Sequence, residues 1–195
     1  IKIMKTLIFS IVLSTMFFAA CNNGTPKNQN DENTTSATAE GPDTKDGSVE
    51  TGSSIKGLLN SYLKIKNALT KDNDKDAADA GNEMVKAFDS FDKASLTAEQ
   101  AKVYNDIVDD AKEHAEHIGA NAGNIEHQRE HFETLSQETY ELVKVVGAGQ
   151  KLYVDNCPMY NKNKGANWLS ETKDIENPYL GKSMQTCGTV KEELN

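Results

Sequence analysis

The sequence predicts a mainly α-helical protein, in which an up-and-down antiparallel four-helix bundle is followed by a small irregular cap rich in cysteine and methionine. Apolar residues recur with a helical period through residues 55–147. Short polar turns divide this stretch into four segments, which favours antiparallel neighbours. Residues 148–195 lose the helical period. We expect them to form a cap that packs on the bundle within one domain and has room for one hairpin.

The N-terminus has the features of an exported lipoprotein. Lys2 and Lys5 precede a mainly apolar run from Leu7 to Ala20, which is too short to span a bilayer but typical of a signal-peptide core. Small residues directly before Cys21 favour cleavage there and lipidation of this cysteine; an ordinary secretory signal is the alternative. Residues 1–20 are therefore predicted to be a signal peptide. We expect the mature protein in the cell envelope, lipid-anchored on the periplasmic side.

Residues 21–54 are predicted to be a disordered tether. They contain almost no side chain that could enter a core, so burial cannot offset the entropy of ordering them. Without Lys2 and Lys5, 19 basic residues stand against 30 acidic ones, and the net charge is −11. Such a charge argues against nucleic-acid binding, which depends on neutralising phosphates, and it suits cations.

Each of the four helical segments carries an apolar stripe. The first stripe runs from Ile55 to Leu69, with Lys66 as its single polar member. Thr97 to Gln100 form a capping-box sequence that opens the third segment, and Gly147 is a plausible stop for the fourth. The stripes of the second, third and fourth segments are Ala77, Ala80, Met84, Ala87, Phe88 and Phe91; Val103, Ile107, Ala111, Ala115 and Ile118; and Ile125, Phe132, Leu135, Leu142, Val143 and Val146.

Within the cap, residues 151–154 are the best strand candidate, and we expect residues 190–194 to add a helical turn. Two cysteines of the cap each have a methionine close by in sequence. Cys157 and Met159 are two residues apart, and Met184 and Cys187 are three apart. Thiolate and thioether are soft donors that select Cu(I) over hard cations. In an oxidising compartment, however, two cysteines are more often joined in a disulfide, so both interpretations stay open.

The four histidines flank the turn between the third and fourth segments. His114 and His117 come before it, and His127 and His131 come after it. Spacings of three and four place each pair on one helix face. In an antiparallel hairpin, His117 lies level with His127, and His114 lies level with His131. The sequence leaves open whether the imidazoles meet as a zinc or copper site or belong to a solvated face together with neighbouring glutamates.

The C-terminal segment carries the spaced positions of a recognisable signature. They are Tyr153, Cys157, Pro158 and Met159; Gly165, Ala166, Trp168 and Leu169; and Ile175, Asn177, Pro178, Tyr179, Gly181, Met184, Cys187 and Gly188, with Gln128, Arg129, Phe132, Leu135 and Ser136 upstream. This pattern resembles the domain-of-unknown-function family 3347 over roughly residues 55–194. Similar domains occur as stand-alone lipoproteins and on periplasmic adaptor subunits of copper and silver efflux pumps.

The segment at Cys157 also resembles the Tyr-x-Cys-Pro-Met-His-Pro motif of a small heavy-metal-binding domain of those adaptors. Here Tyr160 and Asn161 replace His and Pro, so one nitrogen ligand of that motif is missing. The resemblance implies heavy-metal binding, with Cys157, Met159, Met184 and Cys187 as ligands, Cu(I) as the metal, and silver or zinc as alternatives. Trp168 and Tyr179 would shield the sulfurs or stack on a cation, and the alternative role of Trp168 is a packing anchor between cap and bundle.

The first functional hypothesis is a binding protein: a tethered chaperone or buffer that holds Cu(I) for an efflux or delivery partner. The second is a disulfide-stapled helical module that docks on an envelope or efflux-adaptor partner without metal. We do not expect an enzyme, because the sequence has no nucleophile set beside a histidine in a known motif and no glycine-rich phosphate loop.

Overall fold

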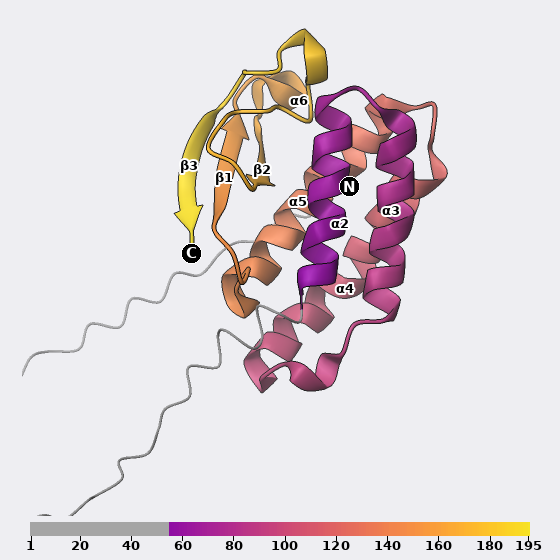
Figure 1. Ribbon diagram of the computed structural model, residues 1–195, viewed down its shortest axis with the longest axis vertical. Coiled ribbons are helices and arrows are strands. Elements are labelled where there is room, and N and C mark those ends of the chain that lie inside the picture. The colour runs from indigo at the N-terminus through magenta and orange to yellow at the C-terminus, as the bar shows by residue number, and fades with distance from the viewer. Residues whose placement is uncertain (1–54) are drawn as a thin grey trace, which may run out of the picture. The chain divides into compact units, whose positions relative to one another are not determined.

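The computed structural model describes residues 55–195 (Figure 1). The predicted signal peptide, the tether and Cys21 lie outside these residues. Four long helices come first: α2 (Lys56–Thr70), α3 (Asp74–Asp89), α4 (Ala98–Ala120) and α5 (Ile125–Val146). Three strands follow, β1 (Leu152–Cys157), β2 (Ala166–Ser170) and β3 (Thr189–Leu194), with the short helices η1 (Lys93–Ser95), α6 (Tyr160–Asn163) and η2 (Gly181–Ser183) in the connections. The fold is thus mainly helical with a small C-terminal sheet.

Side-chain caps begin three of the long helices. The side chain of Asn73 accepts a hydrogen bond from the Asp76 amide at the start of α3, and Asn124 does the same for His127 in α5. Thr97 and Gln100 form the capping box predicted at the start of α4, with both reciprocal hydrogen bonds present. These caps allow connections of only a few residues between α2 and α3 and between α4 and α5, so the helices of each pair lie side by side (Figure 1).

The helices pack in chain order, α2 on α3, α3 on α4 and α4 on α5. Their facing sides form one core, which includes Tyr62, Met84, Ile118 and Phe132, each 1% exposed or less. The predicted stripes supply most of this core, although Ala87 and Phe91 are only partly buried. Lys66, the polar member of the first stripe, is also buried, and its ammonium lies 3.0 Å from a carboxylate oxygen of Glu171.

The cap is more regular than the sequence predicted. β1 pairs antiparallel with β2 and with β3, giving the sheet order β2–β1–β3. The expected hairpin is therefore present as β1 and β2. The helical turn expected at residues 190–194 was wrong, because this segment pairs with the second edge of β1 instead. Backbone groups at that edge need partners, and this tertiary requirement overrides the weak local preference of a Lys-Glu-Glu sequence.

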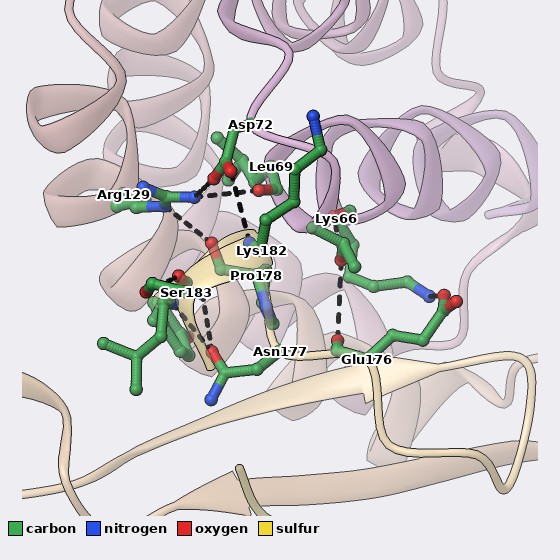
Figure 2. Close-up of polar contacts among 12 residues, drawn as sticks. Lys66, Leu69, Asp72, Arg129, Glu176, Asn177, Pro178, Lys182 and Ser183 are labelled. Atoms are coloured by element: carbon green, nitrogen blue, oxygen red, sulfur yellow. Dashed lines mark hydrogen bonds and ion pairs between the residues drawn. The ribbon is translucent and has the colours of Figure 1, made fainter. Parts of the chain in front are cut away.

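The sheet packs against the helices through α5 and α2, both of which contact β2. A second attachment lies at the end of the helices where α2 turns into α3 (Figure 2). Here Arg129 of α5 donates to the carbonyl oxygens of Leu69 (2.9 Å) and Pro178 (2.8 Å) and to the carboxylate of Asp72 (2.6 Å). One guanidinium thus joins two helices and the segment that precedes η2.

Gly181 allows this close approach. A Cβ atom at this position would lie 1.9 Å from the carboxylate of Asp72 and 2.4 Å from the guanidinium of Arg129, and its φ of +53° also favours glycine. The backbone amide of Lys182 then donates to the second carboxylate oxygen of Asp72 at 3.2 Å.

Within residues 55–195, no helix combines the length and the apolar character needed to cross a membrane.

Candidate metal-binding sites

The structure brings Cys157 and Cys187 together. Cys157 is buried at the end of β1, and Cys187 is partly exposed in the loop before β3. Their Sγ atoms lie 3.4 Å apart and are not bonded. Thirty residues separate the two cysteines in the chain, so their proximity depends on the path of the loop that carries Cys187.

Asn177 holds that loop in place. Its side-chain amide donates to the carbonyl oxygen of Cys187 at 2.7 Å, and its backbone amide donates to the carbonyl oxygen of Gln185 at 2.8 Å. Its side-chain oxygen accepts from the amides of Tyr179 and Leu180. Asn177 is fully buried, and this set of hydrogen bonds fixes the position of the Cys187 backbone beside Cys157.

Met159 and Met184 are the large apolar side chains that stand exposed within residues 55–195, at 50% and 41%. Met159 follows Cys157 by two residues, and Met184 precedes Cys187 by three. Met184 also accepts a hydrogen bond from the Cys187 amide at 3.0 Å through its carbonyl oxygen. Both thioethers therefore lie at the surface, in the segments that flank the two thiols.

The thiol of Cys187 is held in its protonated form by its partner. The hydrogen bond with Cys157, the desolvation of the thiol and the negative charge that Cys157 would carry as a thiolate raise the pKa of Cys187 above its ordinary value. Two neighbouring thiolates repel each other, so a cation between the sulfur atoms would favour loss of both protons.

The aromatic residues predicted to shield the sulfurs belong to the core. Trp168 is 1% exposed and Tyr179 is 2% exposed, and their rings meet edge to face with centroids 5.9 Å apart. A Cβ at Gly188 would lie 3.0 Å from the Trp168 ring, so this ring packs directly beside the residue that follows Cys187. Trp168 is thus placed as a packing anchor close to the sulfur pair.

The four histidines converge from α4 and α5. Nδ1 of His114 lies 2.8 Å from Nδ1 of His131, and Nε2 of His131 lies 3.2 Å from Nε2 of His127. The rings of His117 and His131 are stacked with centroids 4.3 Å apart. One nitrogen each of His117, His127 and His131 can be chosen so that all three lie within 4.8 Å of one another.

Burial lowers the pKa of His131 to about 4, with the other three imidazoles adding to the effect in the order His117, His127 and His114. Burial also lowers the pKa of His114, although the carboxylates of Glu113 and Asp110 oppose the shift. At neutral pH both rings are therefore neutral, which is the form of histidine that binds metal ions.

Residues 58–151 match a protein-family model. Its description is "Protein of unknown function (DUF3347)". The DUF3347 match covers α3, α4, α5 and most of α2, and it includes all four histidines. Cys157, Met159, Met184 and Cys187 lie beyond its last matched residue. No match was found among curated proteins or among solved structures.

Asp155 was missed by the sequence reasoning. It is buried on β1, opposite Trp168 on β2, and neither carboxylate oxygen has a hydrogen-bond partner among the described residues. Burial raises its pKa to about 6, and the positive charge of Lys66 offsets part of this shift. Asp155 precedes Cys157 by two residues in the same strand, and this spacing puts both side chains on one face of the sheet. The buried carboxyl of Asp155 therefore lies on the same face as the buried thiol of Cys157.

Proposed function

We propose that this protein is an envelope lipoprotein that binds a soft metal ion, Cu(I), as a chaperone or buffer linked to metal efflux. The ligands would be the thiolates of Cys157 and Cys187 and the thioethers of Met159 and Met184. The observation that carries this proposal is the pairing of two free thiols 3.4 Å apart with two exposed methionines that flank them.

Exposed methionines beside paired thiols favour a metal site over simple packing. A large apolar side chain at the surface gains little from the hydrophobic effect, so packing gives no reason for Met159 or Met184 at these positions. A thioether that can reach an ion beside two thiolates adds a neutral soft donor. Cu(I) would also replace the two thiol protons and relieve the repulsion between the thiolates.

The exposure of the thioethers suits transfer of the ion. Cys157 is buried whereas Cys187, Met159 and Met184 reach solvent, so a partner can reach three of the four sulfurs. The ion would pass by ligand exchange, with the exposed thioethers replaced first and the buried thiolate last. We propose an efflux adaptor protein as the partner, and silver or zinc as alternative ions.

The remainder of the chain would place this site at the membrane surface. We propose that an up-and-down four-helix bundle supports the sheet, that residues 21–54 form a tether, and that a lipid on Cys21 anchors the tether on the periplasmic side. Such a tether would confine the site near membrane-bound partners and raise their effective concentration.

A second candidate function rests on the same sulfur distance. Two thiols 3.4 Å apart need little movement to close a disulfide. The protein would then be a stapled helical module that docks on an envelope or efflux-adaptor partner without metal. Counting free thiols by mass spectrometry in protein taken from the envelope separates the two functions. Two alkylatable thiols at Cys157 and Cys187 support metal binding, and their absence supports the staple.

An anaerobic Cu(I) titration of the reduced protein against a coloured chelator tests metal binding. All samples carry Cys21→Ser, so that only the cap provides thiols. We expect withdrawal of one copper per chain and loss of this competition in the Cys157→Ser, Cys187→Ser variant. Met159→Leu, Met184→Leu should bind copper roughly 100-fold more weakly, since it removes two weak ligands that each contribute on the order of 1.4 kcal/mol.

The control is Met84→Leu, which replaces a methionine that is 1% exposed in the core. This change conserves volume and should leave copper competition as it was. Equal competition by the protein with and without Cys157 and Cys187 would rule out the sulfur site.

A further inference from the structure

The turn between α4 and α5 brings the four histidines together, two from each helix. His114 and His117 are one helical turn apart on α4, and His127 and His131 are one turn apart on α5. The ring of His131 is the centre of the group, since it contacts the rings of the other three. All four residues are partly buried, so solvent still reaches the group.

The contacts of the rings distinguish two kinds of nitrogen. Nδ1 of His127 lies 3.4 Å from a carboxylate oxygen of Glu130, and Nδ1 of His131 lies 2.8 Å from Nδ1 of His114. A proton on each of these Nδ1 atoms satisfies both contacts and leaves both Nε2 atoms as free acceptors. These two Nε2 atoms lie 3.2 Å apart, so in these tautomers their lone pairs face each other and a cation can take the place of the proton that would otherwise join them.

We propose that His117, His127 and His131 bind a divalent transition-metal ion through their imidazole nitrogens, and that His114 is a positioning residue that fixes the tautomer of His131. This site shares no residue with the proposed sulfur site, so each proposal can be tested independently of the other. It takes a borderline ion such as Zn²⁺ or Cu²⁺, for which imidazole is a preferred ligand.

The distances fit such an ion. Tetrahedral zinc with Zn–N bonds of 2.0–2.1 Å has neighbouring nitrogens about 3.3 Å apart, and the Nε2 atoms of His127 and His131 are 3.2 Å apart. His117 is now stacked on His131, and its side chain is 44% exposed. It can therefore turn about χ2, a broad torsion for histidine, to direct a nitrogen at the ion.

The other contacts of these histidines are of the kind that orients a metal-binding imidazole ring. Metal-binding histidines usually donate their second ring nitrogen to a carboxylate or another acceptor, which fixes the ring and its tautomer. Glu130 takes this position for His127 and His114 takes it for His131. Glu113 lies 3.7 Å from His117. Carboxylates around the group attract a cation, and three protein ligands leave a fourth position for water or an exchangeable ligand.

Zn²⁺ titration of a thiol-free protein tests the proposal. The Cys21→Ser, Cys157→Ser, Cys187→Ser variant removes all three cysteines of the chain, so zinc cannot bind to sulfur. We expect one Zn²⁺ per chain by isothermal titration calorimetry and a higher melting temperature with zinc. His127→Gln and His131→Gln should each weaken binding at least 100-fold, and Glu116→Gln, an exposed neighbour, should change it less than threefold.

Circular dichroism of the metal-free variants verifies that each remains folded, since loss of helix would also abolish binding. Absence of zinc binding in the folded thiol-free protein overturns the site. Binding that persists unchanged in both His127→Gln and His131→Gln also overturns it.

The role of His114 is tested with Cu²⁺ and electron paramagnetic resonance. Loss of a second partner of a ligating histidine typically costs roughly 10–100-fold in affinity. His114→Ala should therefore bind more weakly than the parent but keep the splitting from three nitrogens, whereas His127→Gln should lose one nitrogen. Loss of one nitrogen in His114→Ala would make His114 a ligand and overturn the assignment.

Discussion

Three buried ionisable side chains lie where the helices meet each other or the sheet. Lys66 of α2 is 1% exposed and has Glu171 and Glu176 as ionic partners, at 3.0 and 3.9 Å. Both carboxylate oxygens of Asp155 in β1, and one of Glu138 in α5, have no hydrogen-bond partner among residues 55–195. A buried charge is costly unless it is paired. Lys66 is paired in this way, whereas burial raises the pKa values of the unpaired Asp155 and Glu138 carboxyls.

Glu138 predicts a specific pH dependence of stability. Burial, then the charges of Asp110 and Glu141, raise its pKa from 4.5 to about 7. The folded state therefore holds a proton that the unfolded state has released between these values, so stability falls as pH rises from about 4.5 to 7. Glu138→Gln removes this pH-dependent loss of stability. Its free energy of unfolding, relative to that of the wild type, should therefore increase by about 2–3 kcal/mol from pH 4 to pH 8.

Urea unfolding at both pH values measures this difference. Glu126→Gln, which replaces an exposed residue of the same helix that does not act on the Glu138 pKa, is the matched control and should show little of the effect. A constant difference between Glu138→Gln and the wild type across this range would contradict the assignment to Glu138.

At the scale of elements, α3 and α4 approach each other closely at Gly81 and Gly119. Gly81 of α3 faces the backbone of α4, and a Cβ there would lie 2.8 Å from the carbonyl oxygen of Ala115 and 2.8 Å from the amide of Gly119. These neighbours are backbone atoms, which cannot turn aside as a side chain can. The two glycines thus set the distance between α3 and α4, and α4 carries two of the four histidines.

Gly81→Ala should destabilise the protein by roughly 1–3 kcal/mol, the usual cost of overpacking a close contact. Gly57→Ala is the matched control, because Gly57 is an exposed helical glycine whose added Cβ would lie 3.9 Å from Ala87. This control should stabilise the protein by about 0.4–1 kcal/mol through the lower entropy of its unfolded chain. Thermal unfolding of both variants measures the contrast, and a stabilising Gly81→Ala would disprove the close contact.

At the scale of the whole molecule, polar contacts between distant segments help to hold the sheet and its loops on the helices. Arg129 connects the α2–α3 turn to the segment before η2. Burial of Asp72 would raise its pKa, but the hydrogen bonds from Arg129 and from the Lys182 amide outweigh this and lower it. At the opposite edge of the sheet, Lys144 pairs with Glu192 of β3 at 2.6 Å in an exposed contact.

Arg129→Met should lower the free energy of unfolding by about 2–4 kcal/mol, because it leaves two carbonyl oxygens and the Asp72 carboxylate without their donor. Lys144→Met should leave the urea midpoint nearly unchanged, since its ion pair is exposed to solvent and screened. Equal midpoints for the two variants would show that the Arg129 contacts do not hold the cap on the helices.

Much of the helical part was predictable from local signals. The stripe from Ile55 to Leu69 and the capping sequence at Thr97 act within a few residues, and both have the predicted structure. β3 was not predictable in this way, because Thr189–Leu194 becomes a strand only beside the free edge of β1. Lys66 interrupts the apolar stripe because its ionic partners, Glu171 and Glu176, lie far from it in the sequence.

By itself the sequence determined the positions of the four long helices and the spacing of the cysteines and histidines along the chain, because helical period and caps depend on near neighbours. The tertiary structure decided which of these residues meet. Whether the edges of α4 and α5 that carry histidine face each other depends on how the helices pack. The distance between Cys157 and Cys187 depends on a loop that buried Asn177 holds in place. Such contacts between distant segments arise from the packing of the whole chain, which no local pattern encodes.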